Sequence, residues 1–172
     1  MPDRDQSRAG ALLAACALFC AVVVVLGQVF QHVFDMQPCA WCVLQRLLFL
    51  LVGVACALGA WVLRSRLPRL GATLAADLFA SAGLAAALYQ HFVASRTDSC
   101  VLTLADRIVM ALSLHELAPS VFLATASCAE ANLPLLGIPF ALWSAAAFLM
   151  LGVAAALALV LQLRSRAVLR RA

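Results

Sequence analysis

The sequence predicts an all-α membrane protein, a four-transmembrane-helix bundle with a short interfacial helix in its longest loop. Of the 172 residues, 66% are hydrophobic and only 12% are charged, a composition typical of membrane proteins. At about 1.5 Å per residue, about 20 apolar residues cross a hydrocarbon core of roughly 30 Å. Four segments meet this length, so we expect one integral-membrane domain over residues 1–172, with spans at about 11–30, 43–63, 70–93 and 140–163.

The first span, residues 11–30, could instead be read as a cleaved signal peptide. Such a peptide has an apolar core of only about 7–15 residues, followed by a cleavage site of small residues. Here the apolar stretch is longer, and residues 27–32 (Gly-Gln-Val-Phe-Gln-His) do not form such a site. We therefore expect a permanent helix.

Three connections join the spans. Residues 31–42 form a short loop, residues 64–69 a basic hairpin, and residues 94–139 the one long loop. Short loops favour antiparallel neighbours, so we expect an up-down arrangement. Small residues at Gly53 and Gly83 suit close packing between the helices.

The long loop contains one stretch with helical periodicity, between Val101 and Leu117. Its apolar residues recur on one helical face, but it is too short and too charged to span a bilayer. We interpret it as a helix that lies in the membrane interface. The alternative is an ordinary loop helix packed on the bundle. The apolar positions are Val101, Leu104, Ala105, Ile108, Val109 and Leu112.

The arginines predict the orientation, because cytoplasmic loops carry an excess of positive charge. The chain has no lysine, and nine of its 12 basic residues lie in the N-terminus, the 64–69 hairpin and the C-terminal tail. We expect both termini to be cytoplasmic and the loops at 31–42 and 94–139 to face outward. The nine are Arg4, Arg8, Arg64, Arg66, Arg69, Arg164, Arg166, Arg170 and Arg171.

Charge and histidine spacing exclude two classes of function. A net charge of +4, divided among separate segments, does not indicate nucleic-acid binding. None of the histidines (His32, His91 and His115) lies four residues from a cysteine or another histidine. We therefore expect no metal site.

The seven cysteines fall into two groups. Cys16, Cys20 and Cys56 lie inside predicted spans, where a thiol packs as a small hydrophobic group. The other four lie in the outward loops, an even number that suits an oxidising compartment: Cys39, Cys42, Cys100 and Cys128. Two structural disulfides are one interpretation of these four.

The Cys39–Cys42 pair favours redox chemistry instead. A two-residue spacer adds little stability as a disulfide, but it keeps a second thiol available for exchange. The pair lies at the N-terminal end of a span, where free backbone N–H groups favour a thiolate at either cysteine. Arg46 follows one turn later, and an arginine inside a span costs several kcal/mol unless it is paired. Snorkelling to the outer interface is the other explanation of Arg46.

The absence of other cofactor motifs from the sequence favours a membrane quinone as the electron acceptor. The sequence lacks a dinucleotide-binding glycine motif, a flavin domain and a Cys-x-x-Cys-His haem motif. A membrane quinone needs only a lipid-facing slot and a positive group, and Arg46 can stabilise the negative charge that develops on a quinone oxygen. The choice between ubiquinone and menaquinone stays open.

These motifs resemble the bacterial DsbB family, quinone-linked oxidases of the periplasmic protein DsbA. The resemblance covers about residues 11–163, and the order of the cysteines is its most specific part. The matching residues are Pro38-Cys39-x-x-Cys42 with Arg46, Tyr89-Gln90-His91, Cys100, Val121-Phe122, Cys128-Ala129-Glu130 and Leu136-Gly137.

The resemblance implies a role for each site residue. Reduced DsbA would attack Cys100, whose partner is Cys128, and Cys39 would exchange with that loop pair. Cys42 would pass electrons to the quinone. Arg46 would bind the quinone, as would His91. The same resemblance implies a multi-pass protein of the bacterial inner membrane with its cysteine loops in the periplasm and with DsbA, lipid and quinone as partners.

Two other functions remain open at this point. The protein could be a membrane assembly protein with two structural disulfides, or a relay that runs in the reductive direction. Asp77, inside the third span, is a candidate functional residue by position. We expect it to snorkel or to pair with an arginine.

Overall fold

The computed structural model describes residues 2–63, 65–96 and 103–169. Four long helices dominate it, and each is long and apolar enough to cross a membrane. They confirm the predicted four-helix membrane bundle. The helices are α1 (Pro2–Val33), α2 (Ala40–Ala57), α3 (Arg66–Phe92) and α8 (Phe140–Leu169).

The long helices extend beyond the predicted spans. α1 continues to Val33, three residues past the expected end of its span. α2 begins at Ala40, directly after Cys39, and continues into the π-helical turn η1 (Leu58–Val62). Polar residues at the ends of these helices hid the true boundaries from a hydropathy argument, because helix ends reach past the hydrocarbon core.

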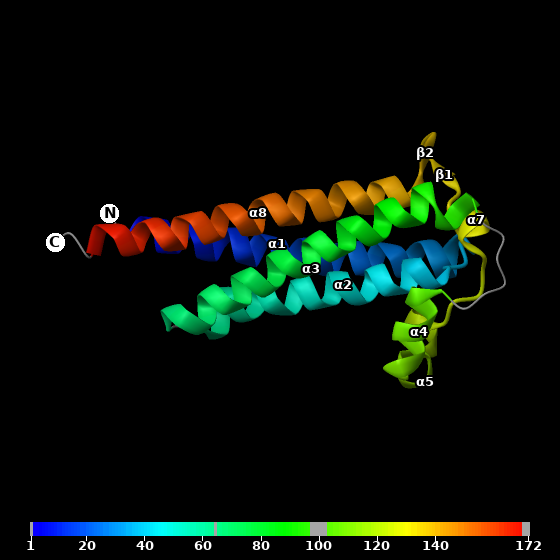
Figure 1. The fold of residues 1–172 in the computed structure, drawn as a ribbon, viewed down its shortest axis with the longest axis horizontal. Coiled ribbons are helices and arrows are strands. Elements are labelled where there is room, and N and C mark those ends of the chain that lie inside the picture. The colour runs from blue at the N-terminus through cyan, green and yellow to red at the C-terminus, as the bar shows by residue number, and fades with distance from the viewer. Residues whose placement is uncertain (1, 64, 97–102, 170–172) are drawn as a thin grey trace.

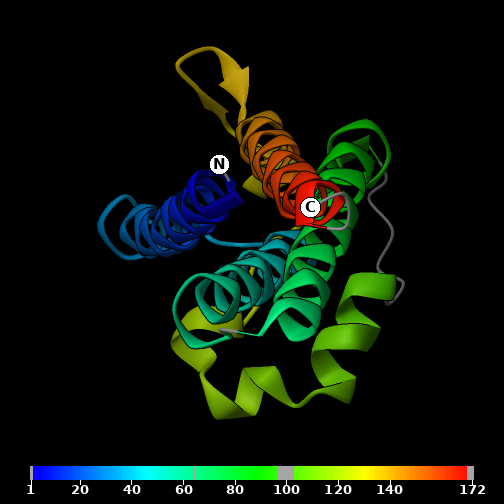
Figure 2. The same cartoon turned by 90° about the vertical axis from the view of Figure 1, so that its left-hand side faces the viewer.

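The four helices pack side by side as a bundle. α3 contacts both α8 and α2, and α1 contacts the same two helices from the other side. Both termini lie at one end of the bundle, and the short helices and the hairpin lie at the other end (Figure 1). The view along the bundle shows α1 and α3 on opposite sides of it (Figure 2). The arginine-rich and the cysteine-rich loops are thereby separated.

Aromatic stacking and small residues hold the bundle core together. The rings of Phe49 and Phe148 stack with centroids 3.8 Å apart and an interplanar angle of 11°. Gly83 lies directly under the Phe148 ring. An added Cβ at Gly53 would approach the Cβ of Cys20 to 3.1 Å, so α1 and α2 are close there. Small residues allow such contacts where lipid supplies no hydrophobic driving force.

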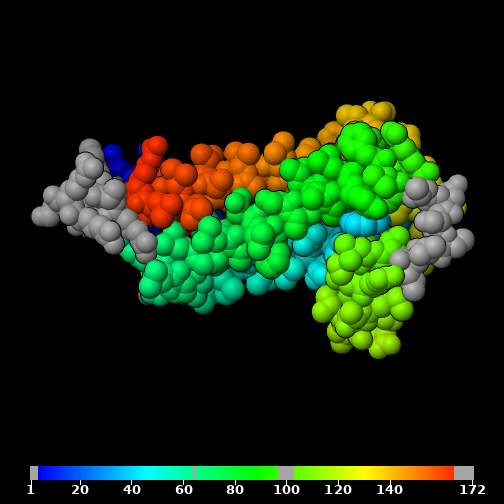
Figure 3. Space-filling model, viewed as in Figure 1, coloured from blue at the N-terminus to red at the C-terminus, as the bar shows by residue number. Residues whose placement is uncertain are grey.

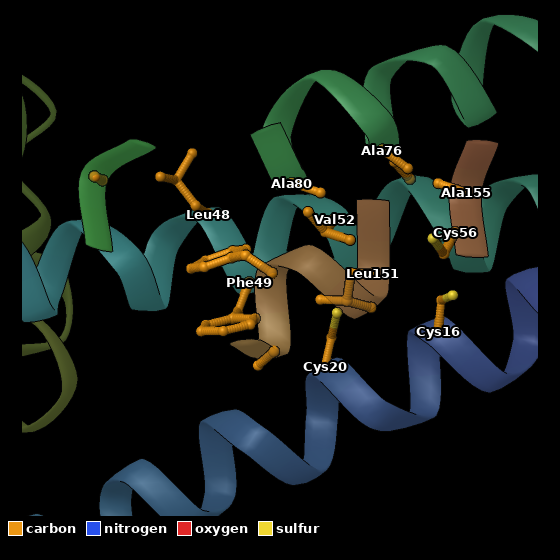
Figure 4. Packing of buried hydrophobic residues seen from close by; sticks show 14 of the residues in the cluster. Cys16, Cys20, Leu48, Phe49, Val52, Cys56, Ala76, Ala80, Leu151 and Ala155 are labelled. Carbon is orange, nitrogen blue, oxygen red and sulfur yellow. The ribbon is translucent and has the colours of Figure 1, made fainter. Parts of the chain in front are cut away.

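The three cysteines of the spans are part of this core. Cys16 and Cys20 of α1 are 5% and 2% exposed, and Cys56 of α2 is fully buried. Figure 4 shows them among Val52, Leu151 and other apolar side chains. Their surroundings are those expected of thiols that pack as small hydrophobic groups.

Within its described residues, 94–96 and 103–139, the long loop forms five short helical segments and a hairpin. The space-filling view shows α4 projecting beside the bundle, next to α2 and α3 (Figure 3). The segments are η2 (Ala94–Arg96), α4 (Leu104–Ala111), α5 (Leu114–Leu117), α6 (Pro119–Phe122) and α7 (Cys128–Ala131), followed by β1 (Pro134–Leu135) and β2 (Ile138–Pro139). Cys100 lies outside the described residues.

α4 is the amphipathic helix expected in this loop. A capping box defines its start, in which the Thr103 side chain accepts from the Asp106 N–H and the Asp106 side chain accepts from the Thr103 N–H. Ala105 and Val109 are buried on the bundle side, whereas Met110 is half exposed. The helix therefore packs on the bundle, as the alternative interpretation held, and also keeps an outward apolar side. Its contact with lipid stays a prediction.

The β-hairpin leads into α8. Its two strands pair antiparallel, with Leu135 opposite Ile138. Leu136 and Gly137 form the two-residue turn, and both have positive φ angles, 54° and 81°. Such turns require positive φ at both positions, so the leucine adopts a conformation that usually favours glycine.

Candidate functional site

Three cysteines from two separate parts of the chain meet at the end of the bundle. Cys39 is the N-cap residue of α2, and Cys42 lies in its first turn. The Cys39 thiol donates to the Cys42 sulfur over 3.4 Å. Cys39 also forms a side-chain hydrogen bond with Cys128, the first residue of α7. Cys39 therefore lies between the other two sulfurs.

Two features of the loop bring Cys128 to this place. The backbone N–H groups of Thr125 and Ala126 donate to the Pro38 carbonyl over 3.0 and 3.3 Å. A second capping box then starts α7, in which Ser127 and Glu130 each accept a backbone hydrogen bond from the other. The loop is thus attached to the residue just before Cys39.

Glu130 is fully exposed and acts through this cap. The hydrogen bonds from the Ser127 backbone and then from its side chain lower the pKa of the Glu130 carboxyl. The ionised carboxylate is the better acceptor for the free N–H at a helix start. Glu130 therefore helps to order Cys128 without contacting a sulfur itself.

Protonation differs between Cys39 and Cys128. The hydrogen bonds with Cys128 and with Cys42, together with burial, raise the pKa of the Cys39 thiol. The pKa of Cys128 is lowered, first by the hydrogen bond with Cys39 and then by one with the Trp41 backbone. These hydrogen bonds favour a thiolate at Cys128 and a neutral thiol at Cys39.

A cavity of about 670 Å³ lies beside Cys42, between α1, α2 and α8. Most of its lining is apolar or aromatic, and the polar side chains at its Cys42 end include Gln45 and Arg46. This combination of an apolar wall with a few polar groups is typical of small-molecule sites. The aromatic residues of the lining are Phe19, Phe30, Phe49, Phe140 and Trp143.

Arg46 is tied to other parts of the chain rather than extended to the interface. One guanidinium nitrogen donates to Gln31 Oε1 over 2.6 Å and to the Val121 carbonyl over 2.9 Å. The other donates to the Gly27 carbonyl over 3.2 Å. Arg46 also interacts electrostatically with Cys42. It therefore joins α1, α2 and α6 and places a fixed positive charge at the cavity.

A pair of buried amides lies next to the cysteines on the α3 side. Gln45 Nε2 donates to Gln90 Oε1 over 2.6 Å. Gln90 Nε2 in turn lies 3.2 Å from the Cys42 sulfur and 3.6 Å from the Cys39 sulfur. Gln90 is fully buried and Gln45 is 3% exposed. Sequence reasoning missed this pair, although uncharged amides in the outer turns of two apolar spans were a visible signal.

His91 does not lie at the cavity. It is absent from the residues that line the cavity, and its ring lies against Phe92 and 3.4 Å from Asn132. It follows Gln90 directly, so the helix turns its side chain to a different face. We expected His91 to lie with Arg46 at the quinone site. The structure does not bring His91 together with Cys42 and Arg46.

Of the two settings expected for Asp77, pairing with an arginine is not seen in the described part of the chain, and snorkelling stays a prediction. Its carboxylate lies near Gly152 of α8. Among the residues that the structure describes, no arginine forms an ion pair with it. The described residues also contain no group of three or more histidine, cysteine or acidic side chains that could hold a metal ion.

Comparisons with known proteins identify the family of this chain. The family described as disulfide bond formation protein DsbB matches residues 8–158. Disulfide bond formation protein B of Dechloromonas aromatica is 34% identical over 144 residues, 80% of this chain and 84% of the relative. The protein of the same name from Shewanella loihica is 33% identical over 79% of this chain and 74% of its own length. The one from Stutzerimonas stutzeri is 29% identical over 75% and 81%, respectively. The chain therefore belongs to the DsbB family of disulfide bond formation proteins.

Proposed function

We propose that this chain reoxidises a periplasmic DsbA-type dithiol protein and passes the electrons through Cys39 and Cys42 to a membrane quinone. Family membership makes the chain a membrane oxidoreductase that generates disulfides. The observation that supports this route is the position of Cys39. Its sulfur lies between Cys128, which belongs to the loop, and Cys42, which lines the membrane cavity.

The arrangement of the three sulfurs supports the following exchange step. The DsbA-type dithiol reduces the Cys100–Cys128 disulfide and becomes oxidised itself. The Cys128 thiolate, the better nucleophile of the pair it forms with Cys39, then attacks Cys39 of a Cys39–Cys42 disulfide. The new bond joins Cys39 to Cys128, and Cys42 is released as a thiolate at the cavity. Cys100 then attacks Cys128 and restores both the loop disulfide and the Cys39 thiol.

The residues of the cavity fit a quinone. The apolar and aromatic walls suit a flat ring with an isoprenoid tail, and Arg46 offers a positive charge where a ring oxygen becomes negative. When bound, a quinone accepts two electrons and two protons and is released as quinol. The chain supplies both electrons from Cys39 and Cys42, whose thiols lose two protons as their disulfide forms again.

The same proposal assigns an orientation in the bacterial inner membrane. α4, α5 and α7 lie at the end of the bundle opposite the two termini (Figure 1), and α7 begins at Cys128. The arginine excess at the terminal end supports a cytoplasmic location for the termini. The loop end is then periplasmic, and the exposed leucines of α4 and α5, Leu104 and Leu117, would rest on the outer membrane surface.

Steady-state turnover tests the proposal and its direction. The purified protein in lipid nanodiscs is mixed with a reduced DsbA-type protein and a soluble ubiquinone or menaquinone analogue. We expect one quinol for each disulfide formed in the partner. Quinol oxidation coupled to reduction of the partner would instead establish the reductive direction. Failure to reduce either quinone would support an assembly protein with structural disulfides.

Replacing Arg46 with alanine should impair use of the quinone more than thiol exchange. Loss of the charge at the cavity should raise the apparent quinone KM about tenfold, which corresponds to about 1.4 kcal/mol. Thiol exchange should change less, since Arg46 reaches the loop only through the Val121 carbonyl. The two half-reactions, followed separately by stopped-flow absorbance, measure both effects.

Arg107→Ala is the matched control for Arg46→Ala, because it also removes an arginine from the cysteine-loop side of the protein. Arg107 is exposed on α4 and does not line the cavity, so Arg107→Ala should leave the quinone KM unchanged. Arg46→Lys keeps the charge but cannot reach all three acceptors, and an intermediate KM is expected. Equal loss of both half-reactions in Arg46→Ala would show that Arg46 is a folding residue and not a quinone contact.

A further inference from the structure

The Gln45–Gln90 pair lies at the reacting sulfurs and has no part in the route described above. Both side chains are buried, and they come from different helices, α2 and α3. A buried carboxamide must satisfy its polar atoms with protein partners, because leaving one unpaired costs about 1–3 kcal/mol. Here the Gln90 amide nitrogen donates to two cysteine sulfurs, and its oxygen accepts from Gln45.

We propose that Gln90 is a catalytic residue that donates a hydrogen bond to the Cys42 sulfur and stabilises its thiolate, and that Gln45 is a positioning residue for Gln90. This inference rests on the proposed function, since it concerns the state of Cys42 between exchange and electron transfer. In this proposal the neutral Gln90 amide shares with the Arg46 charge the task of stabilising the Cys42 thiolate.

The distances indicate which sulfur gains most. Gln90 Nε2 is 3.2 Å from Cys42 and 3.6 Å from Cys39. A sulfur that carries a negative charge is a much better acceptor than a neutral thiol. Since exchange releases Cys42 as the thiolate, the shorter contact is on the sulfur that becomes charged. Cys39 is the thiol that donates toward Cys42, so the Cys42 sulfur receives hydrogen bonds from two sides.

Gln45 determines which end of the Gln90 amide faces the sulfurs. The oxygen and nitrogen of a glutamine side chain differ little in shape, so the hydrogen-bond network selects the orientation. Gln45 Nε2 donates to Gln90 Oε1 and thereby leaves the NH₂ group facing Cys42. The reverse orientation would point an oxygen at a thiolate, and the two would repel each other.

The amide and Arg46 complement each other at Cys42. Arg46 lines the cavity together with Cys42, whereas Gln90 is not among the lining residues. Gln90 can therefore act on the sulfur without contacting a molecule in the cavity. We accordingly expect Gln90 variants to lower kcat and to leave the quinone KM unchanged, the opposite of the Arg46 pattern.

The rate of Cys42 alkylation as a function of pH tests this inference directly. The reduced full-length protein in nanodiscs is treated with iodoacetamide, and Cys42 labelling is followed by peptide mass spectrometry. In Gln90→Met the pH midpoint should rise by about one unit, so that the thiolate fraction at neutral pH falls about tenfold. Gln45→Met should shift the midpoint in the same direction by a smaller amount, since the Gln90 amide is then free to rotate.

Two further variants separate this role from simple loss of packing. Gln90→Glu keeps the size but replaces the donor with an acidic group, so its midpoint should rise at least as far as in Gln90→Met. Gln162→Met removes another buried glutamine, one that donates to Thr73 at the opposite end of the bundle, and the midpoint should stay at the wild-type value. If Gln90→Met does not fold, the alkylation midpoints of Gln90→Glu and Gln45→Met test the role of Gln90 in its place.

An unchanged midpoint in folded Gln90 variants would overturn the inference. Alkylation requires neither quinone nor a partner protein, so this result is independent of the turnover assay. A wild-type protein that fails to reduce quinone would refute the proposed function, while a shifted midpoint would still support the role of Gln90. An active enzyme with unshifted variants would refute the role of Gln90 alone.

Discussion

Replacing Cys42 with serine is expected to abolish quinone-dependent oxidation of the partner protein. A serine hydroxyl forms no disulfide with Cys39 and does not ionise near neutral pH, so neither exchange nor electron transfer can pass this position. Turnover should fall to the rate measured without protein. The assay is quinol formation with reduced DsbA-type protein as the donor.

The same variant should still react with thiols at the loop. Cys100 and Cys128 are unchanged in this variant, so a reduced partner should still reduce the Cys100–Cys128 disulfide in a single exchange. Peptide mass spectrometry follows the loss of that bond. Cys20→Ser is the matched control, because Cys20 is a buried cysteine of α1 that packs in the core, and it should retain turnover. Substantial quinone reduction by Cys42→Ser would disprove the route through Cys42.

Replacing Gly83 with alanine is expected to cause the largest loss of stability in the bundle. The added Cβ would overlap the Phe148 ring, and Phe148 is 1% exposed and stacked on Phe49. Because the ring is buried and stacked, α3 and α8 must separate or the stack must shift. Overpacking of this kind typically costs about 1–3 kcal/mol. Thermal unfolding in a mild detergent measures the change.

Gly71 provides the control on the same helix. It is exposed, and a Cβ built there meets nothing within 4 Å. Gly71→Ala should therefore be neutral or slightly stabilising, since alanine favours a helix by about 0.5–1 kcal/mol over glycine. Equal melting temperatures for Gly83→Ala and Gly71→Ala would mean that Phe148 adjusts freely and that the packing described here does not limit stability.

Hydropathy alone predicted most of the membrane fold. The four spans could be found because length and apolar composition are sufficient to identify a transmembrane helix. The charge pattern correctly grouped the termini at one end. What hydropathy could not supply were the short helices α5 to α7, since segments of four residues carry no periodic signal.

Two pairs of residues in the loop have the sequence pattern of a capping box. Thr103 with Asp106, and Ser127 with Glu130, both match the spacing of a helix start. The second pair places Cys128 at the first position of α7. Attention to this spacing would have predicted an ordered Cys128 from sequence.

The contacts of the site itself depend on tertiary structure. Arg46 and Val121 are 75 residues apart, and Gln45 and Gln90 are 45 apart. No local pattern connects such residues, so the sequence could identify Arg46 as unusual but could not name its partners. For the same reason the sequence could not show that Gln90, and not its neighbour His91, occupies the helix face toward the cysteines.

The order in which disulfides form tests the relay most directly. Fully reduced protein is mixed with a quinone analogue, quenched with acid after increasing times, and mapped by mass spectrometry. We predict that the Cys39–Cys42 disulfide forms first, in step with quinol, and that the Cys100–Cys128 disulfide follows it. Appearance of a loop disulfide before Cys39–Cys42, with quinol formed at the same rate, would contradict the account.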